Sequence, residues 1–181
     1  YPAEYHFRAF EAIAEGICGC TDKVVISFLD CYGKTKRNMR GIPLETPDEE
    51  IMKRTGERFV KTAEKYGMTV ESCAETVDLS EVGVRHGSCV DPAMIERILG
   101  VPVRVKKDKN QRPECGCVES VETGAYDTCL CGCKYCYAND SEGAVMRRRA
   151  EYDVHAPLLC GRVEEGDRIT VRRTSRILTG E

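Results

Sequence analysis

The chain has 181 residues and a mass of 20.2 kDa, enough for one good hydrophobic core but not for two large domains. No apolar run approaches the roughly 20 residues that a membrane-spanning helix needs, so we expect a cytoplasmic protein without a membrane partner. The net charge of −3 excludes a generally basic nucleic-acid coat, although local basic patches remain. The unusual feature is twelve cysteines, six of which lie between Cys115 and Cys136.

An apolar stripe predicts an amphipathic helix at the start of the chain. Its members are Phe7, Phe10, Ile13 or Ala14, and Ile17. Since the chain starts at Tyr1, within this pattern and without a methionine, we expect the C-terminal part of a longer protein, truncated at its N-terminus. A short buried strand follows in residues 23–29.

A second helix is predicted to begin with a capping box, in which Thr46 is the N-cap, Pro47 the first helical residue and Glu49 the partner of the cap. Gly67 ends this helix. The later predicted elements are a strand over residues 68–71, a helix capped by Asp91 and Pro92 and closed by Gly100, a strand over 101–105, a helix over 142–151 and a final strand over 169–171.

This alternation of strands and helices predicts an α/β fold, with a parallel sheet that is open or part of a (β/α) barrel. Ligands gather at the carboxyl ends of such strands. Asp30 follows one predicted strand, and Cys73 and Glu75 follow another, so we expect them on the functional rim. We predict an α/β domain over residues 1–110 and a cysteine-rich iron–sulfur segment over residues 111–181 that packs on it.

The cysteines point to a metal more than to disulfides. Disulfide frameworks suit short secreted chains with weak cores, whereas this chain has a core pattern and opens with no signal-peptide pattern. Thiols set two residues apart, as in Cys115-Gly-Cys117, also pair poorly with each other. We therefore expect a metal or iron–sulfur site in a reducing compartment.

The segment from Cys129 to Cys136 contains the spacing C-x3-C-x2-C, formed with Cys133. Three thiolates on one tight loop can hold three irons of a 4Fe–4S cube. The fourth iron is then open to a substrate or cofactor, unless Cys131 or a distant cysteine supplies a ligand.

This spacing, with Tyr135 directly before the last cysteine, resembles the signature of the radical S-adenosylmethionine (SAM) enzymes. The surrounding loop is similar to that of spore-photoproduct-lyase-like proteins. The chain resembles still more closely an uncharacterised family of cysteine-rich proteins, domain of unknown function 1848. The matching stretches are residues 27–30, 32–38, 73–75, 106–112, 115–120 and 158–161.

The resemblance implies a 4Fe–4S cluster on Cys129, Cys133 and Cys136 that binds SAM at its open iron and cleaves it reductively, to act on an unknown substrate. It further implies that Tyr135 packs near the cofactor and that a ferredoxin or flavodoxin donates electrons. Catalytic residues are not identified. Where relatives tend to carry histidine this chain has Cys131, which leaves open which thiols ligate the cluster.

The position of this loop conflicts with the usual radical SAM order, in which most of the barrel follows the three cysteines. Only 45 residues follow Cys136, too few for several βα units. Either the barrel lies upstream, as in a circular permutation, or the cluster belongs to a small appended ferredoxin-like unit. We favour the permuted barrel because the upstream sequence is itself βα.

A second metal site is a further expectation, either another iron–sulfur cluster or zinc. Its candidate ligands are Cys73, Cys89, Cys115 and Cys117, with Cys160 in reserve. The alternatives are that Cys73 and Cys89 are small buried hydrophobic residues, or that the C-x-C pair joins Cys133-x2-Cys136 in a zinc knuckle.

Two basic stretches, residues 34–40 and 104–112, are compatible with a phosphate-bearing substrate or nucleic acid, and equally with solvated charge. Two other functions therefore stay open beside the enzyme. One is a non-catalytic iron–sulfur module for electron transfer or regulation, whose fourth iron is closed by Cys131 or a remote cysteine. The other is a zinc-stabilised module that binds nucleic acid.

Overall fold

The computed structural model describes residues 1–44 and 46–171, so residues 172–181 of the predicted iron–sulfur segment lie outside the described residues. The described chain forms two compact units. Unit 1 contains residues 1–29 and 46–120, and unit 2 contains residues 30–44 and 121–171. The predicted domain boundary at residue 110, and the predicted packing of the second segment on the first domain, stay predictions.

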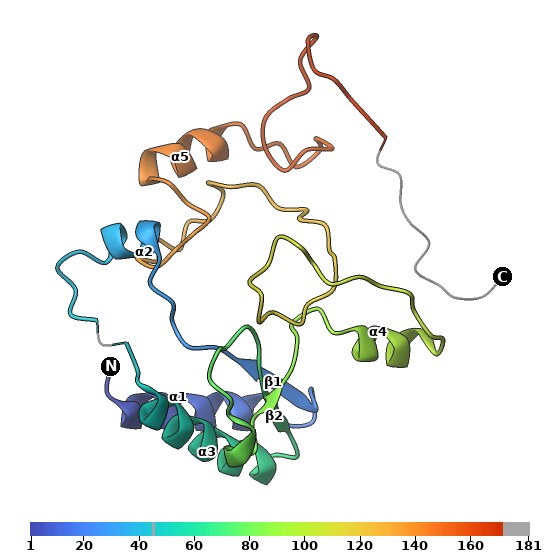
Figure 1. The fold of residues 1–181 in the computed structure, drawn as a ribbon. Helices are drawn as coiled ribbons and strands as arrows, with labels where there is room; N and C mark the ends of the chain where they lie inside the picture. The colour runs from blue at the N-terminus through green and yellow to red at the C-terminus, as the bar shows by residue number, and fades with distance from the viewer. Residues whose placement is uncertain (45, 172–181) are drawn as a thin grey trace. The chain divides into compact units, whose positions relative to one another are not determined.

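Two helices of unit 1, α1 (Ala3–Gly16) and α3 (Glu49–Lys65), lie side by side (Figure 1). The apolar stripe predicted for the first helix is confirmed, because it buries Phe10 and Ala14. The ring of Phe10 stacks on that of Phe59 with centroids 4.2 Å apart. Such aromatic pairs add to the hydrophobic burial that holds helices together.

The predicted start of the second helix is wrong by two residues. Asp48, not Thr46, is the N-cap, and its side chain accepts a hydrogen bond from the Ile51 N–H at 2.8 Å. A carboxylate satisfies the free N–H groups and also interacts favourably with the helix dipole, which explains the preference over a hydroxyl. As expected, the chain turns at Gly67, whose φ of +72° suits glycine.

The sheet of unit 1 is open and has three strands, β1 (Lys23–Ile26), β2 (Thr69–Ser72) and β3 (Arg85–His86), in that order. Both pairings are parallel, with Ile26 opposite Ser72 and Ser72 opposite His86. A mixed helix and strand fold with a parallel sheet is thus confirmed, whereas the barrel stays a prediction. All three strands run in one direction, so the segments that follow them emerge at one edge.

The main core of unit 1 lies between the sheet and the two helices. Its buried members are Phe10, Ala14, Ala63, Met68, Val70, Leu79 and Val84. The last two follow β2 in the segment that contains the short 3-10 helix η1 (Ser80–Val82). This core fixes where the carboxyl end of β2 lies, and with it the residues that follow.

Helix α4 (Pro92–Leu99) has the predicted caps, because Asp91 accepts a hydrogen bond from the Ala93 N–H and Gly100 has a φ of +69°. The predicted strand over residues 101–105 does not form. Pro102 has no N–H to give to a ladder, and the Val103 N–H is used by the Glu96 carboxylate at 2.9 Å. The predicted strand over residues 169–171 does not form either.

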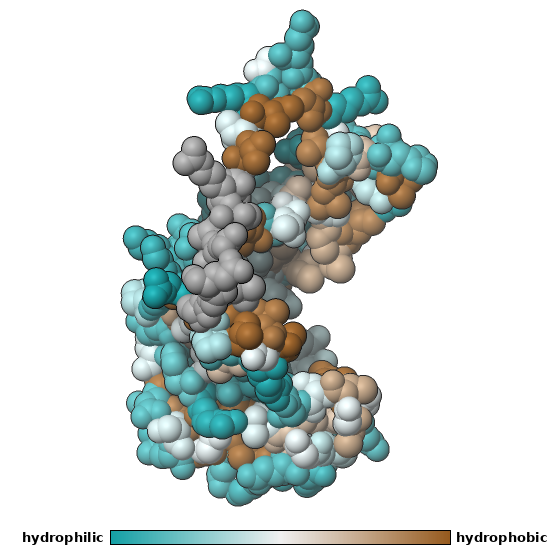
Figure 2. Space-filling model, turned by 90° about the vertical axis from the view of Figure 1, so that its right-hand side faces the viewer, coloured by the Kyte–Doolittle hydropathy of each residue, from teal (hydrophilic) through white to brown (hydrophobic). Residues whose placement is uncertain are grey.

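Unit 2 contains α2 (Gly33–Asn38), a short helix that was not predicted and that overlaps the first basic stretch, and α5 (Glu142–Ala150), which matches its prediction. Among the described residues of unit 2, Val145 is the one buried hydrophobic side chain. Figure 2 shows hydrophobic side chains interspersed with hydrophilic ones on the surface. Burial of apolar surface alone is a weak source of stability for so thin a core.

None of the described helices is both long enough and apolar enough to cross a lipid bilayer.

Candidate metal centres

The cysteine loop of unit 2 is closed at its base by two hydrogen bonds. The Asp127 N–H donates to the Ala138 carbonyl at 3.0 Å, and the Asp140 N–H donates to Asp127 Oδ1 at 2.5 Å. Asp127 has a φ of +59°, which is uncommon for a residue other than glycine and marks a locally constrained backbone. These hydrogen bonds therefore hold the two ends of the cysteine loop together at Asp127.

Asn139 ties the first and last motif cysteines together. Its side-chain Nδ2 donates to the Cys129 carbonyl at 2.6 Å, and its backbone N–H donates to Cys136 Sγ at 3.3 Å. Between them, the Cys136 N–H donates to the Cys133 carbonyl at 3.1 Å. Asn139 lies three residues after the motif and gave no signal of this role in the sequence, because the contact depends on the fold of the loop.

The three motif cysteines line one cavity of about 470 Å³. Cys129, Cys133 and Cys136 are among its walls, and Cys131 is not. Helix α5 contributes Val145 and Met146 to the same cavity. Tyr135, predicted to pack near a cofactor, is 57% exposed and does not line the cavity.

The thiols of this loop differ in acidity. A hydrogen bond from the Cys131 N–H lowers the pKa of Cys129. The pKa of Cys131 is raised, first by its side-chain hydrogen bond to Cys129 and then by the negative charge of nearby thiolates. Since the thiolate is the form that binds metals, Cys129 is the better prepared ligand of the two.

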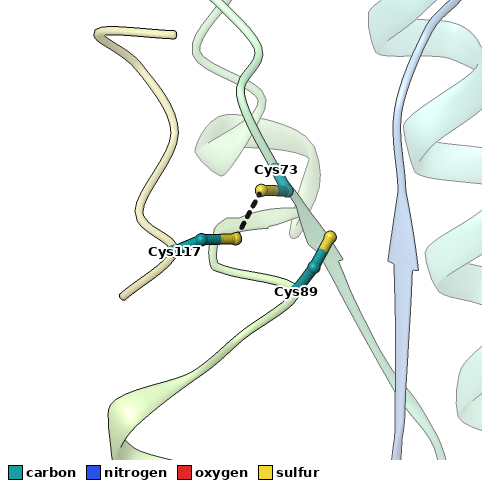
Figure 3. A group of neighbouring side chains, drawn as sticks. All are labelled: Cys73, Cys89 and Cys117. Carbon is teal, nitrogen blue, oxygen red and sulfur yellow. Dashed lines mark hydrogen bonds between the residues drawn. The ribbon is translucent and has the colours of Figure 1, made fainter. Parts of the chain in front are cut away.

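A second group of cysteines converges in unit 1, at the edge where the strands end (Figure 3). The Sγ atoms of Cys73, Cys89 and Cys117 all lie within 4.8 Å of one another. Cys73 directly follows β2, and its Sγ lies 3.8 Å from both Cys117 Sγ and Cys115 Sγ. Three of the four cysteines considered for a second site thus form one group, Cys115 contacts Cys73 from outside that group, and Cys160 belongs to unit 2.

This thiol group is largely withdrawn from solvent. Cys73, Cys115 and Cys117 are between 4% and 8% exposed, and only Cys89 is open to solvent. Burial raises the pKa of Cys115 to about 11 and also raises that of Cys73. Burial pushes the Cys117 pKa the same way, but hydrogen bonds led by that from the Val90 N–H, 3.3 Å away, lower it overall.

Two features of the backbone hold these cysteines in place, and neither has a clear signature in the sequence. Ala74, which follows Cys73, is buried and has a φ of +61°. Gly116 packs so closely that a Cβ atom there would meet the Gly87 carbonyl oxygen at 3.1 Å and Ser88 Cβ at 3.4 Å. A glycine between two cysteines is the one available hint, since it permits close backbone approach.

The remaining polar residues predicted for the rim differ in their surroundings. Glu75 Oε1 accepts a hydrogen bond from the Phe28 N–H at 2.7 Å, so it joins the segments that follow β1 and β2. Asp30 belongs to unit 2. From the basic stretches, Lys34 is engaged by Asp140 and by the Tyr137 carbonyl within unit 2.

Together these features define a cysteine-rich protein of mixed helix and strand structure with a candidate metal-binding group. Over residues 1–138 the chain matches the family described as Domain of unknown function (DUF1848), and it belongs to that family. The match confirms the family resemblance, and it spans both groups of cysteines. No match was found among curated proteins or among solved structures.

Proposed function

We propose that this chain is an iron–sulfur protein of the radical SAM type, with a 4Fe–4S cluster held by Cys129, Cys133 and Cys136. The observation that carries the proposal is that these three side chains line one cavity while Cys131, within the same loop, does not. Three ligands from one loop leave one iron without a protein ligand, which is the arrangement that an iron-bound cofactor requires.

The residues around the cavity fit such a group. The Asn139 N–H donates to Cys136 Sγ, and hydrogen bonds to ligand sulfurs stabilise reduced clusters and tune their potential.

The volume also suits a small-molecule cofactor, since ligand pockets commonly measure about 300–1,000 Å³. Helix α5 contributes apolar Val145 and Met146, and the polar groups of Ser141 and Glu142 lie at its start. We propose that these side chains orient the cofactor and limit the access of water. Tyr135 is proposed to pack against it after SAM has bound.

Cys129, Cys133 and Cys136 would hold such a cluster, which would pass one electron from a ferredoxin- or flavodoxin-type donor to SAM and so supply the reductive cleavage of SAM needed to remove a hydrogen atom from the substrate. A phosphate-bearing molecule or nucleic acid is the proposed substrate class, because Lys36, Arg37 and Arg40 are exposed on unit 2.

A reducing, cytoplasmic compartment suits the free thiols of all twelve cysteines. A permuted barrel is the fold proposed for the complete protein.

The test is anaerobic reconstitution with iron and sulfide, followed by electron paramagnetic resonance of the reduced protein with and without SAM. We expect the cluster spectrum to change when SAM is added, and 5′-deoxyadenosine to form once dithionite is present. Cys129→Ala, Cys133→Ala and Cys136→Ala should each abolish both signals. A cluster spectrum that ignores SAM, with no 5′-deoxyadenosine above background, would contradict the proposal.

Cys131→Ala is the matched control, because it removes a thiol from the same loop but not from the cavity wall. In the open-cluster proposal this variant keeps its cluster and its response to SAM. If Cys131→Ala loses the cluster, the loop instead holds a closed cluster of four thiolates, which is suited to electron transfer or regulation.

A further inference from the structure

We propose that Cys73, Cys89, Cys115 and Cys117 form a closed, mononuclear zinc site in unit 1, separate from the cysteine loop and without a catalytic role.

The distances between the sulfur atoms favour one metal ion over a cluster. A tetrahedral zinc ion with Zn–S bonds of about 2.3 Å places its sulfur ligands about 3.8 Å apart. The Sγ atoms of Cys73 and Cys117 lie 3.8 Å apart, and those of Cys73, Cys89 and Cys117 all lie within 4.8 Å of one another. Cys115 Sγ lies 3.8 Å from Cys73 Sγ but outside that group of three, so it has to move toward the others to complete the tetrahedron. A disulfide would need about 2.05 Å, and the ligands of a polynuclear cluster would be spread over several irons.

The origin of the four thiols argues against a chance cluster of small hydrophobic residues. They come from three separate segments: the end of β2, the residues just after β3, and the 115–117 turn. Convergence on one point from several segments is what a metal site requires, whereas packing alone only requires that each thiol be buried somewhere. Cys89 is exposed, which gives an ion a path from solvent to the otherwise buried sulfurs.

A hydrogen-bond donor and contact with solvent are available to stabilise the negative charge of a four-thiolate site. Four thiolates and one Zn²⁺ carry a formal net charge of −2, which buried surroundings tolerate only with hydrogen-bond donors nearby. The Val90 N–H supplies one, to Cys117 Sγ at 3.3 Å. Solvent reaches the site at Cys89.

The backbone next to the ligands is specialised as well. The left-handed conformation of Ala74 costs energy because alanine has a Cβ atom. Strained backbone conformations of this kind are concentrated at sites that hold ligands. The close approach of Gly116 to the Gly87 carbonyl holds the C-x-C turn against the segment of Cys89.

Four protein ligands leave no open coordination position, so the site is structural. Its structural task is visible in the fold. Residues 101–120 contain no described helix or strand, and their regular pairing is limited to isolated bridge positions such as Lys107 with Val118. The ion would fasten this segment to the carboxyl end of β2.

The experiment measures zinc, iron and sulfide in the anaerobically purified 181-residue chain carrying Cys129→Ala, Cys133→Ala and Cys136→Ala together. This background removes the proposed cluster, so the result does not depend on it. We expect one equivalent of zinc, with no iron or sulfide. Adding Cys117→Ser should lower zinc to below one tenth of an equivalent, whereas Cys20→Ser, an exposed cysteine of the same unit, should leave it unchanged.

Cobalt(II) provides a measurement that does not depend on whether the Cys117 variant folds. Titrated into the zinc-free background protein, it should give the intense visible bands and thiolate charge-transfer absorption of a tetrahedral four-sulfur site, saturating at one equivalent. Iron with sulfide at these residues, a disulfide among them under anaerobic conditions, or cobalt spectra of an octahedral site would each overturn the proposal.

Discussion

Lys34 Nζ lies 2.7 Å from Asp140 Oδ1, although 106 positions separate the two residues in the chain. The same ammonium group also donates to the Tyr137 carbonyl at 2.9 Å. These contacts join α2 to the residues that follow the motif cysteines, and Lys34 lowers the pKa of the Asp140 carboxyl group. Lys34, which belongs to the first basic stretch, thus holds two segments of unit 2 together.

From this contact we predict that Lys34→Ala shortens the lifetime of a reconstituted cluster without abolishing its assembly. Because Asp140 is largely exposed, the effect should not exceed about fivefold. The measurement is the decay of cluster absorbance in the presence of an iron chelator. Lys36→Ala, which removes an exposed charge from the same helix, is the control, and equal decay rates for the two variants would refute the prediction.

Lys23 is the basis of a stability prediction for unit 1. Its Nζ lies 3.0 Å from Glu71 Oε2 and 2.7 Å from Asp91 Oδ2, and all three side chains are mostly buried. Lys23→Met keeps most of the volume but removes the cation from Asp91 and leaves Glu71 with Arg85 at 3.9 Å, so we expect a loss of about 2–3 kcal/mol in the free energy of unfolding. Urea unfolding followed by circular dichroism measures it.

Lys61→Met is the matched control for Lys23, since it breaks an exposed helical pair with Glu57. Such pairs contribute only about 0.3–0.5 kcal/mol. Should the two variants unfold at the same urea concentration, the buried ion pairs of Lys23 would not stabilise unit 1 as argued.

Gly116 tests how strictly the C-x-C turn is positioned. In Gly116→Ala the new methyl group meets backbone at 3.1 Å, so the turn has to shift and carry its two cysteines with it. We expect zinc affinity to fall by about 10–100-fold, the range found when groups that orient metal ligands are changed. Competition with a chromophoric chelator measures the affinity. Gly16→Ala, where no atom lies within 4 Å of the new Cβ, should bind zinc like the unmodified chain.

Removal of zinc should release residues 101–120 before it unfolds the helices. The helices α1 and α3 pack through their own hydrophobic core, whereas the 101–120 segment has little regular structure to hold it. In limited proteolysis after treatment with a zinc chelator, we expect new cleavage at the basic residues between 104 and 112. Cleavage within α3 at the same rate would show that the ion supports the whole unit instead.

Local patterns in the sequence were enough to predict several elements. The apolar stripe that contains Phe10 and Ala14 and the caps at Asp91 and Gly100 are properties of adjacent residues, and the structure has them in place. Caps are ambiguous where two capping residues lie close together, as with Thr46 and Asp48, because either could begin the helix.

Features that depend on distant segments could not be predicted in the same way. Residues 101–105 have the composition of a strand, but a strand also needs a neighbour with free backbone groups, and Pro102 weakens it further. The cysteines of unit 1 were candidate ligands by residue type alone, because only the fold brings Cys73 within 3.8 Å of Cys115 and Cys117. Asn139 and Ala74 carried no signal at all.

The contact between Cys73 and Cys115 spans 42 positions of the chain. A metal ion that binds both residues acts as a cross-link, and a cross-link removes many of the conformations open to the unfolded chain. For a loop of this length, the chain-entropy model gives a stabilisation of about 4 kcal/mol. That is comparable to the whole net stability of many small domains. A sheet of three short strands can therefore stay folded because its unfolded state is restricted, without needing a larger core.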